Sequence, residues 1–211
     1  MQQIKISELT IERIQNRELE KVLPDFYKLE ELVENNPWHN NDNVLNHTIS
    51  VLRELEELIK KLKDEIKVYL DKKIDTHSRK ELLFLAALLH DIGKRETYKK
   101  EKDTTECLGH EEAGVIKLKR ILPNFDLSED GREFVIKLVR HHGFFHDILN
   151  YPGENPEKKT EEFKEKYPDI FLELILLSIA DMCGSQLRLN NPEEFNFRTN
   201  FLNKIINNYR I

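Results

Sequence analysis

The amino-acid sequence predicts an all-α fold, and three observations support this prediction. Apolar residues recur every three or four positions along most of the chain, which is the spacing of a buried helix face. The 211 residues include only 7 glycines and 7 prolines, too few for a chain of many tight turns. No alternation of apolar and polar residues persists for more than a few positions, so no long strand is expected.

Composition and charge narrow the class of protein. Hydrophobic residues make up 39% of the chain and charged residues 34%, and this length fits a single domain over residues 1–211 with one core. The formal net charge is −6, and lysines are interleaved with acids, as in residues 60–65. A protein that grips an extended nucleic acid normally carries a basic stripe. We therefore expect no such footprint, whereas a small phosphorylated partner remains compatible.

The sequence also bears on the compartment. No apolar run approaches the roughly 18 residues that cross a bilayer, and the first residues lack the apolar stretch of a secretory signal. Cys107 and Cys183 show no C-x-x-C spacing, which indicates neither a zinc knuckle nor a disulfide framework. We therefore expect a cytoplasmic protein with reduced thiols and no membrane partner. The oligomeric state does not follow from the sequence.

The first part of the chain predicts short helices and then a long one. Residues 7–35 favour two short helices divided by a proline, and a polar, turn-rich connection follows. Asp42 or Asn43 can cap the next helix, which its apolar spacing extends to about residue 66. His47 lies on that apolar stripe, so its side chain should face the core.

The strongest signal is an uninterrupted apolar run, Leu82–Leu89, which is typical of a buried central helix. A Ser-x-x-Glu capping box precedes the run, and Gly93 follows it as an expected left-handed stop. His90 and Asp91 therefore arrive together at the end of a core helix, where unpaired polar groups are costly. Either a hydrogen-bonded cap or a metal ion would satisfy them.

The second part of the chain predicts further helices with longer connections. We expect a charged loop over residues 95–108, a helix from His110 to Pro123 and a helix from Ser128 to His141 and His142. A lid-like loop should follow over residues 143–168. A second buried helix is expected over 170–181, with Asp181 on its inner face, and a last helix over about 192–209. Three other histidines are expected on the surface or in loops: His39, His77 and His146.

The inward-facing helices thus supply a set of metal-competent side chains. These are His47, His90, Asp91, His110, His141, His142 and Asp181. Imidazole and carboxylate ligands without cysteine favour Fe, Mn, Co, Ni or Zn, in one or two ions, while Mg²⁺ remains possible. The histidines argue against a site for Mg²⁺ or Ca²⁺ alone. Adjacent residues on a helix point about 100° apart, so the sequence does not decide between His141 and His142.

The order of His47, His90-Asp91 and Asp181 resembles the signature of the HD superfamily of metal-dependent phosphohydrolases. The resemblance covers a core of about residues 24–185, on which N- and C-terminal helices would pack. The segments that carry it are most similar to the HD domain attached to bacterial tRNA CCA-adding enzymes: Asn36-Pro37-Trp38-His39, Leu88-Leu89-His90-Asp91-Ile92-Gly93-Lys94, Gly109-His110-Glu111-Glu112-Ala113-Gly114 and Val139-Arg140-His141-His142. No segment resembles the nucleotidyltransferase domain of those enzymes, so CCA addition is not expected.

The resemblance implies roles for the matching positions. His47, His90, Asp91 and Asp181 would hold a first metal ion, and Asp91 with His110 and His141 or His142 would hold a second. Lys94 would contact the phosphate and act with Asp91 in catalysis, and Arg140 is a weaker substrate-binding candidate. The implied activity is hydrolysis of a phosphomonoester or phosphodiester of a nucleotide or cyclic nucleotide by metal-activated water.

Three alternatives remain open from the sequence. A one-metal deoxynucleotidase would use only the four ligands of the first ion. A non-catalytic HD module, which senses a ligand or binds a partner, would keep a structural metal. A di-iron oxygenase would use mixed histidine and carboxylate ligands for oxygen chemistry. The tyrosine-proline element of the HD-GYP cyclic-di-GMP enzymes is absent after His142, which counts against that substrate.

Overall fold

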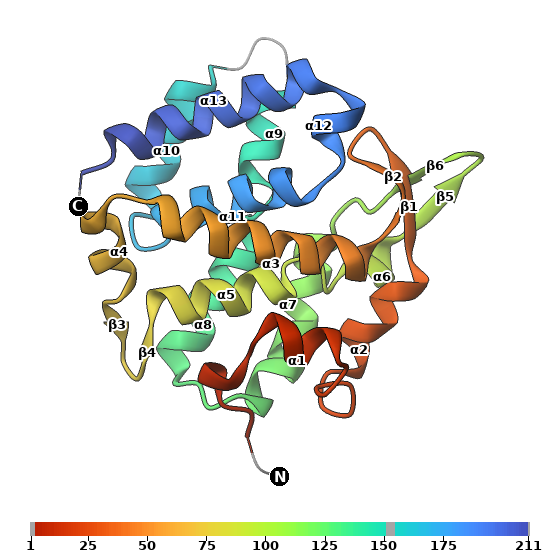
Figure 1. The fold of residues 1–211 in the computed structure, drawn as a ribbon, viewed down its shortest axis with the longest axis horizontal. Coiled ribbons are helices and arrows are strands. Elements are labelled where there is room, and N and C mark those ends of the chain that lie inside the picture. The colour runs from red at the N-terminus through yellow and green to blue at the C-terminus, as the bar shows by residue number, and fades with distance from the viewer. Residues whose placement is uncertain (1–2, 151–154, 211) are drawn as a thin grey trace.

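The computed structural model describes residues 3–150 and 155–210. Helices dominate this part of the chain, as predicted, and its paired strands form three two-stranded antiparallel hairpins (Figure 1). The main helices are α3 (Val44–Lys61), α5 (Arg79–Leu89), α7 (His110–Ile121), α8 (Glu129–His141), α10 (Pro156–Lys166), α11 (Phe171–Gly184) and α13 (Pro192–Asn208). The shorter ones are α1 (Ile11–Gln15), α2 (Pro24–Tyr27), α4 (Asp64–Leu70), α6 (Lys94–Thr97), α9 (Phe144–Asn150) and α12 (Leu187–Asn190).

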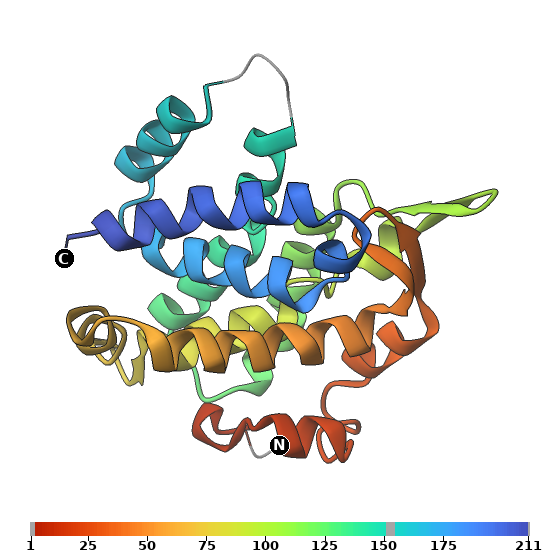
Figure 2. The same ribbon diagram turned by 45° about the horizontal axis from the view of Figure 1, so that its top comes forward.

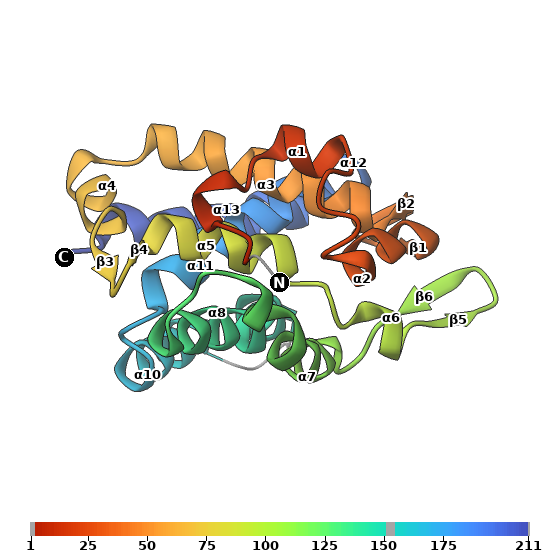
Figure 3. The same ribbon diagram turned by 90° about the horizontal axis from the view of Figure 1, so that it is seen from below.

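The long helices pack as layers around α5. In Figure 1, α13, α11, α3 and α5 lie roughly side by side, and Figure 3 shows α7 and α8 on the other side of α5. The central position of α5 explains its uninterrupted apolar sequence, because Leu82, Leu85 and Leu89 are each fully buried. None of the described helices is both long and apolar enough to cross a bilayer.

The predicted caps of these helices are present. The Ser78 hydroxyl accepts a hydrogen bond from the backbone of Glu81, whose carboxylate accepts one from the backbone of Ser78, so the capping box of α5 is complete. Asn43 caps α3, and Ser128 caps α8 through the backbone N–H of Gly131. Such caps satisfy amides that a helix leaves unpaired at its N-terminus. They fix where α5 starts and hence where its functional end lies.

The segment before α3 differs from the predicted helix and polar connection. Residues Val33–Asn36 form β1 and His39–Asn43 form β2, and the two strands pair as a hairpin. The Asn36 side chain closes the turn by accepting hydrogen bonds from the amides of Trp38 (2.8 Å) and His39 (3.0 Å). The helices expected over 7–35 are correspondingly shorter. The helix expected to reach residue 66 ends at Lys61, and α4 follows after an extended Leu62.

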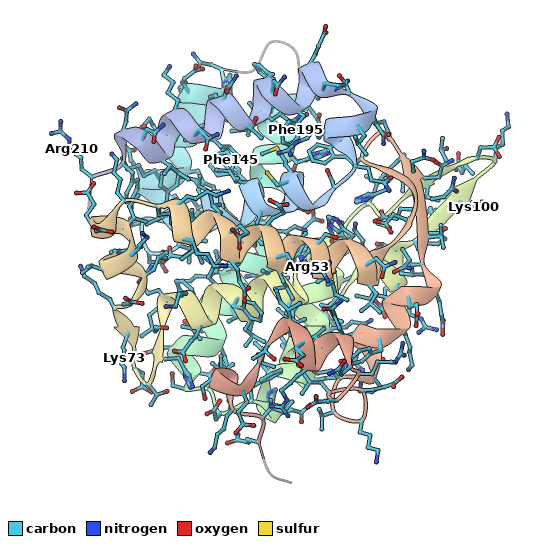
Figure 4. The ribbon with its side chains drawn as sticks, viewed as in Figure 1. Arg53, Lys73, Lys100, Phe145, Phe195 and Arg210 are labelled. Carbon is cyan, nitrogen blue, oxygen red and sulfur yellow. The ribbon has the colours of Figure 1, made fainter. Side chains whose placement is uncertain are left out.

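Two predicted loops contain regular structure. Residues Lys99–Glu101 (β5) and Thr104–Glu106 (β6) form a hairpin that projects from the body of the molecule (Figures 1 and 2). Lys100 on this hairpin lies at the edge of the molecule in Figure 4, whereas Phe145 of α9 is buried in its interior. Much of the expected lid over 143–168 is helical, in α9 and α10. Residues 151–154 of that segment lie outside the described residues.

Gly93 has a different role from the one predicted. Its φ of −86° is right-handed, so the left-handed stop expected at this position is wrong. A Cβ atom on Gly93 would lie 2.1 Å from the carbonyl oxygen of His110 and 2.3 Å from the amide nitrogen of Gly114. The glycine therefore allows the start of α7 to approach the end of α5, and this contact brings His110 next to Asp91.

We expect Gly93→Ala to lower the free energy of unfolding by about 2 kcal/mol or more, because overpacking of a rigid contact typically costs about 1–3 kcal/mol. Urea unfolding of the purified variant measures this change. Gly114→Ala is the matched control, since a Cβ there would lie 3.4 Å from a Val139 methyl group, an ordinary contact. Equal destabilisation of the two variants would contradict the close-approach explanation.

Candidate metal centre

Four side chains from three helices converge at the end of α5. His90 and Asp91 follow its last turn, His47 comes from α3, and Asp181 comes from α11. The Nε2 atom of His47 lies 2.9 Å from Asp181 Oδ1 and 3.7 Å from Asp91 Oδ2. His90 Nε2 lies 3.2 Å from Asp91 Oδ2 and 3.7 Å from Asp181 Oδ1. One ligand atom each from His47, His90 and Asp91 falls within 4.8 Å of the others.

A second cluster shares Asp91 with the first. His110 stands at the start of α7 and His142 follows the end of α8. Their Nε2 atoms lie 3.5 Å and 3.8 Å from Asp91 Oδ1 and 2.9 Å from each other. Asp91 thus turns Oδ2 toward His47 and His90 and Oδ1 toward His110 and His142. A carboxylate placed in this way can bridge two cations.

Three of the histidines are held in the tautomer that a metal ligand needs. The Nδ1 atoms of His90, His110 and His142 lie 2.7–2.8 Å from the backbone carbonyl oxygens of the residues three positions earlier. A carbonyl oxygen only accepts, so in each ring Nδ1 carries a proton, and Nε2 is the nitrogen that faces the cluster and can bind a cation. This is the usual arrangement for a histidine that binds metal.

These Nε2 atoms point at one another rather than at a donor. His110 Nε2 and His142 Nε2 are 2.9 Å apart, which is unfavourable for two acceptors unless a proton or a cation lies between them. His90 Nε2 and Asp91 Oδ2 are buried and make no hydrogen bond of acceptable geometry, although the Lys94 ammonium group lies 3.0 Å from Asp91 Oδ2. Buried polar atoms are rarely left in this state. The donor set, all nitrogen and carboxylate oxygen, therefore fits divalent transition-metal ions.

The ionisable groups of the cluster shift one another's pKa values. Burial opposes ionisation of Asp91, but His90 and Lys94 hold the pKa of its carboxyl well below the usual range. Burial also opposes the charge on Asp181, while the neighbouring imidazoles of His47 and His90 lower its pKa. Without a cation, burial disfavours the charged form of His90, yet the two carboxylates raise its pKa to about 10. The cluster thus stabilises positive charge at its centre.

Lys94 belongs to this site, together with two residues that the sequence analysis did not predict. Its ammonium group is buried and lies 3.0 Å from Asp91 Oδ2 and 2.7 Å from Glu34 Oε2. His39, expected on the surface, is 5% exposed, and its Nε2 lies 3.7 Å from Glu34 Oε2. Glu34 and His39 are brought inward by the hairpin β1–β2. No period in the sequence marked that hairpin. His39 lies in a segment that carries the family resemblance, but no role was assigned to it, and Glu34 lies outside those segments.

Two predicted site residues lie away from the cluster. The ring of His141 packs against Tyr167 and Phe163, with centroid distances of 4.5 and 5.4 Å. The ring of His142 instead points into the cluster, as the rotation of about 100° between neighbouring helical residues requires. Arg140 is directed outward, where its Nε donates to Glu112 at 3.1 Å. The structure therefore brings His142, and not His141, to the cluster of candidate ligands, and Arg140 does not line its pocket.

The cluster of candidate metal ligands opens into a pocket of about 340 Å³. Residues of β1, β2, α7 and α9 form its mouth, among them Trp38, Glu111, His146 and Asp147. His146, also expected to be a surface or loop residue, thus lines the site. Another buried histidine, His77, lies near Asp126 and is not among the residues that line this pocket. A larger hollow of about 870 Å³ at the C-terminal end of α13 contains none of the clustered ligands.

Comparison with known protein families agrees with this geometry. The model of the HD domain matches residues 44–184, more than half of the chain. The chain belongs to the HD domain family. The matched range contains His47, His90, Asp91 and Asp181 together with both histidines of the second cluster. Membership of this family implies metal-dependent phosphohydrolase chemistry.

Two kinds of curated relative share parts of the sequence. The chain is 30% identical over 111 residues to the multifunctional CCA protein of Pasteurella multocida (strain Pm70), which covers 52% of this chain and 26% of that protein. It is 26% identical over 147 residues to the bifunctional uridylyltransferase/uridylyl-removing enzyme of Legionella pneumophila (strain Paris), covering 69% of this chain and 16% of the relative. The match thus spans about a quarter and a sixth of the two relatives.

We expect His142→Ala to lose about one metal ion per chain, because its Nε2 is one of three ligand atoms in the second cluster. His141→Ala should keep the parent metal content, since its ring packs on aromatic residues outside the cluster. Elemental analysis of proteins purified without chelators measures both, and circular dichroism confirms that each variant is folded. Loss of metal from His141→Ala, with full metal content in His142→Ala, would contradict the assignment of His142 rather than His141 as the ligand.

Proposed function

We propose that this HD domain protein hydrolyses a phosphomonoester or phosphodiester of a nucleotide or cyclic nucleotide with two divalent metal ions. The observation that carries the proposal is the position of Asp91, which offers one carboxylate oxygen to each of two histidine clusters. A one-metal site needs only the first cluster. The second cluster, with its two facing Nε2 atoms, favours the two-metal form over a one-metal deoxynucleotidase.

The chemistry divides between the ions and the chain. When bound, divalent cations would lower the pKa of a water molecule and neutralise charge on the phosphoryl group. Asp91, His47, His90 and Asp181 would hold one ion, and Asp91, His110 and His142 the other. The carbonyl partners of the imidazoles keep the rings oriented before any cation arrives, which limits reorganisation during the reaction.

Lys94 is the residue of the chain that we assign to the phosphate. Burial disfavours its charged form, but Asp91 and Glu34 raise its pKa, so the ammonium group stays charged. An ammonium group has three donors; that of Lys94 donates to Glu34 at 2.7 Å and lies 3.0 Å from Asp91 Oδ2. We assign its remaining donor to a phosphoryl oxygen bound next to Asp91. We do not assign Arg140 to the substrate, because it pairs with Glu112 on the outside.

The nucleotide part of the proposal rests on the relatives and the pocket. One group of relatives is named for removing uridylyl groups, and another for the CCA end. The pocket beside the cluster is lined by Trp38. An aromatic ring suits a nucleobase, which stacks on such a surface.

We expect the purified protein, reloaded with Mn²⁺, Co²⁺, Ni²⁺, Fe²⁺ or Zn²⁺ in turn, to hydrolyse at least one member of a panel of nucleoside monophosphates, 2′,3′-cyclic and 3′,5′-cyclic nucleotides and a chromogenic phosphodiester. Asp91→Asn should lower kcat/KM by about 1,000-fold or more, because it removes the shared ligand. Asp103→Asn, an exposed residue between β5 and β6, is the matched control. A metal-loaded parent that hydrolyses nothing in the panel would favour the non-catalytic module.

His110→Ala and His142→Ala separate the two-metal from the one-metal enzyme. We expect each to lower kcat/KM by about 100-fold or more, since a two-metal site clamps both the attacking and the departing oxygen. Steady-state kinetics, measured beside the metal content of each variant, tests this. Full activity with one ion per chain in both variants would support the one-metal deoxynucleotidase.

A further inference from the structure

The pocket over the metal cluster is lined by an unusual excess of negative charge. Its lining contains one ammonium group, that of Lys94, and the carboxylates of Glu34, Asp91, Glu111, Asp147 and Asp181. Two divalent cations would balance the net charge of this set. They would leave no surplus positive charge for a second or third phosphoryl group of a substrate.

Lys94 does not supply that surplus. Its ammonium group lies between Asp91 and Glu34 at the bottom of the site, at 3.0 and 2.7 Å. Among the described residues that line the pocket there is no arginine and no second lysine. A pocket that accepts a polyphosphate normally presents arginine or lysine to each phosphoryl group. The mouth of this pocket presents acids instead.

Glu111 and Asp147 form the acidic part of the mouth. Glu111 follows the proposed ligand His110 in the first turn of α7, and Asp147 lies in the first turn of α9. The Glu111 carboxylate lies against the start of α9, because a Cβ on Gly143 would be 2.7 Å from its Oε1. The backbone N–H of Asp147 donates to the carbonyl oxygen of Gly143 at 3.0 Å, which places Asp147 one turn further along α9. Both residues line the pocket.

The rest of the mouth is uncharged and suits a nucleoside. Trp38 lines it, with the His146 ring at 4.6 Å and the buried Arg198 guanidinium 5.1 Å from the indole centroid. Arg198 also donates to the His146 carbonyl oxygen and to the Asn150 side chain, which ties α13 to α9. Leu108, 75% exposed, adds an apolar side chain to the lining. These residues form a braced aromatic and apolar surface beside the acids.

We propose that the pocket selects a nucleoside that carries a single phosphoryl group, as a monoester or a cyclic diester, and that Glu111 and Asp147 reject a second phosphate. This inference rests on the proposed function, because it assigns the substrate class of the same site. The two carboxylates act as specificity-determining residues, because they repel a second negatively charged group. Like charges across an interface oppose binding in this way. Glu111 Oε2 also lies 3.5 Å from Nδ1 of the proposed ligand His110, so the metal content of Glu111→Gln is measured beside its nucleotide binding.

Calorimetric titration of the Mn²⁺-loaded protein with adenosine 5′-monophosphate, adenosine 3′-monophosphate and adenosine 3′,5′-bisphosphate tests the proposal. We expect the better monophosphate to bind at least about tenfold more tightly than the bisphosphate. Glu111→Gln and Asp147→Asn should each lower the ratio of the two dissociation constants, bisphosphate over monophosphate, about threefold or more. The double variant should lower this ratio further. Sodium chloride at 0.5 M should narrow the parent ratio, because salt screens exposed charges.

Glu112→Gln is the matched control. It makes the same substitution one position along α7, on a side chain that is exposed and pairs with Arg140 outside the pocket. This variant should keep the parent ratio. Equal or tighter binding of the bisphosphate by the parent would overturn the proposal, as would a control that narrows the ratio as much as Glu111→Gln.

Binding and turnover also separate this inference from the proposed function. If the protein discriminates between the nucleotides but hydrolyses no phosphoester, the selection by Glu111 and Asp147 is supported and the proposed enzymatic activity is rejected. If it hydrolyses a phosphoester but does not discriminate between the nucleotides, the proposed enzymatic activity is supported and the selection by Glu111 and Asp147 is rejected. If none of the three nucleotides binds to the metal-loaded protein, the substrate class assigned here is wrong.

Discussion

The structure depends on the burial of one carboxylate. Asp91 is 2% exposed and lies where the ends of α5 and α8, the start of α7 and a face of α3 meet. A buried charge without partners costs several kcal/mol, and this one is surrounded by imidazoles and the Lys94 ammonium group. His90 and Lys94 come from the same segment as Asp91, whereas His47, His110 and His142 come from α3, the start of α7 and the end of α8. The packing of four helices is therefore tied to the charge balance at a single side chain.

The backbone prepares the ligands for that role. His90, His110 and His142 each donate from Nδ1 to the carbonyl oxygen three residues earlier. Two of these carbonyls belong to the last turns of α5 and α8, where helix carbonyls have no intrahelical partner. The imidazole thus satisfies an orphan acceptor and is fixed in orientation by the same hydrogen bond. This explains why His90 and His142 follow helix ends, since one hydrogen bond both caps the helix and orients the ligand. His110 instead stands at the start of α7.

The parts of this arrangement that could be predicted from the sequence are those set by local rules. The capping box at Ser78, the cap at Ser128 and the inward face of His47 follow from spacing within one helix, and the structure has each of them. The choice of His142 over His141 depends on the rotation of α8, which tertiary packing sets. Gly93 was predicted as a left-handed stop, but contact with the start of α7, far along the chain, requires it. Glu34 and His39 were not predicted at the site because their short hairpin carries no periodic signal, although His39 lies in a segment that carries the family resemblance.

The hairpin β1–β2 also gives the lysine of the site a consistent explanation. An ammonium group 3.0 Å from Asp91 competes electrostatically with any cation that the same carboxylate holds. Glu34 offsets this cost, because its carboxylate lies even closer to the ammonium group, at 2.7 Å. The carboxylate of Glu34 and the ammonium group of Lys94 together add almost no net charge next to the cluster. The ammonium group nevertheless remains there as a hydrogen-bond donor. A helical protein that needs a lysine next to a metal centre must bury a second carboxylate there, and the hairpin is the element that delivers it.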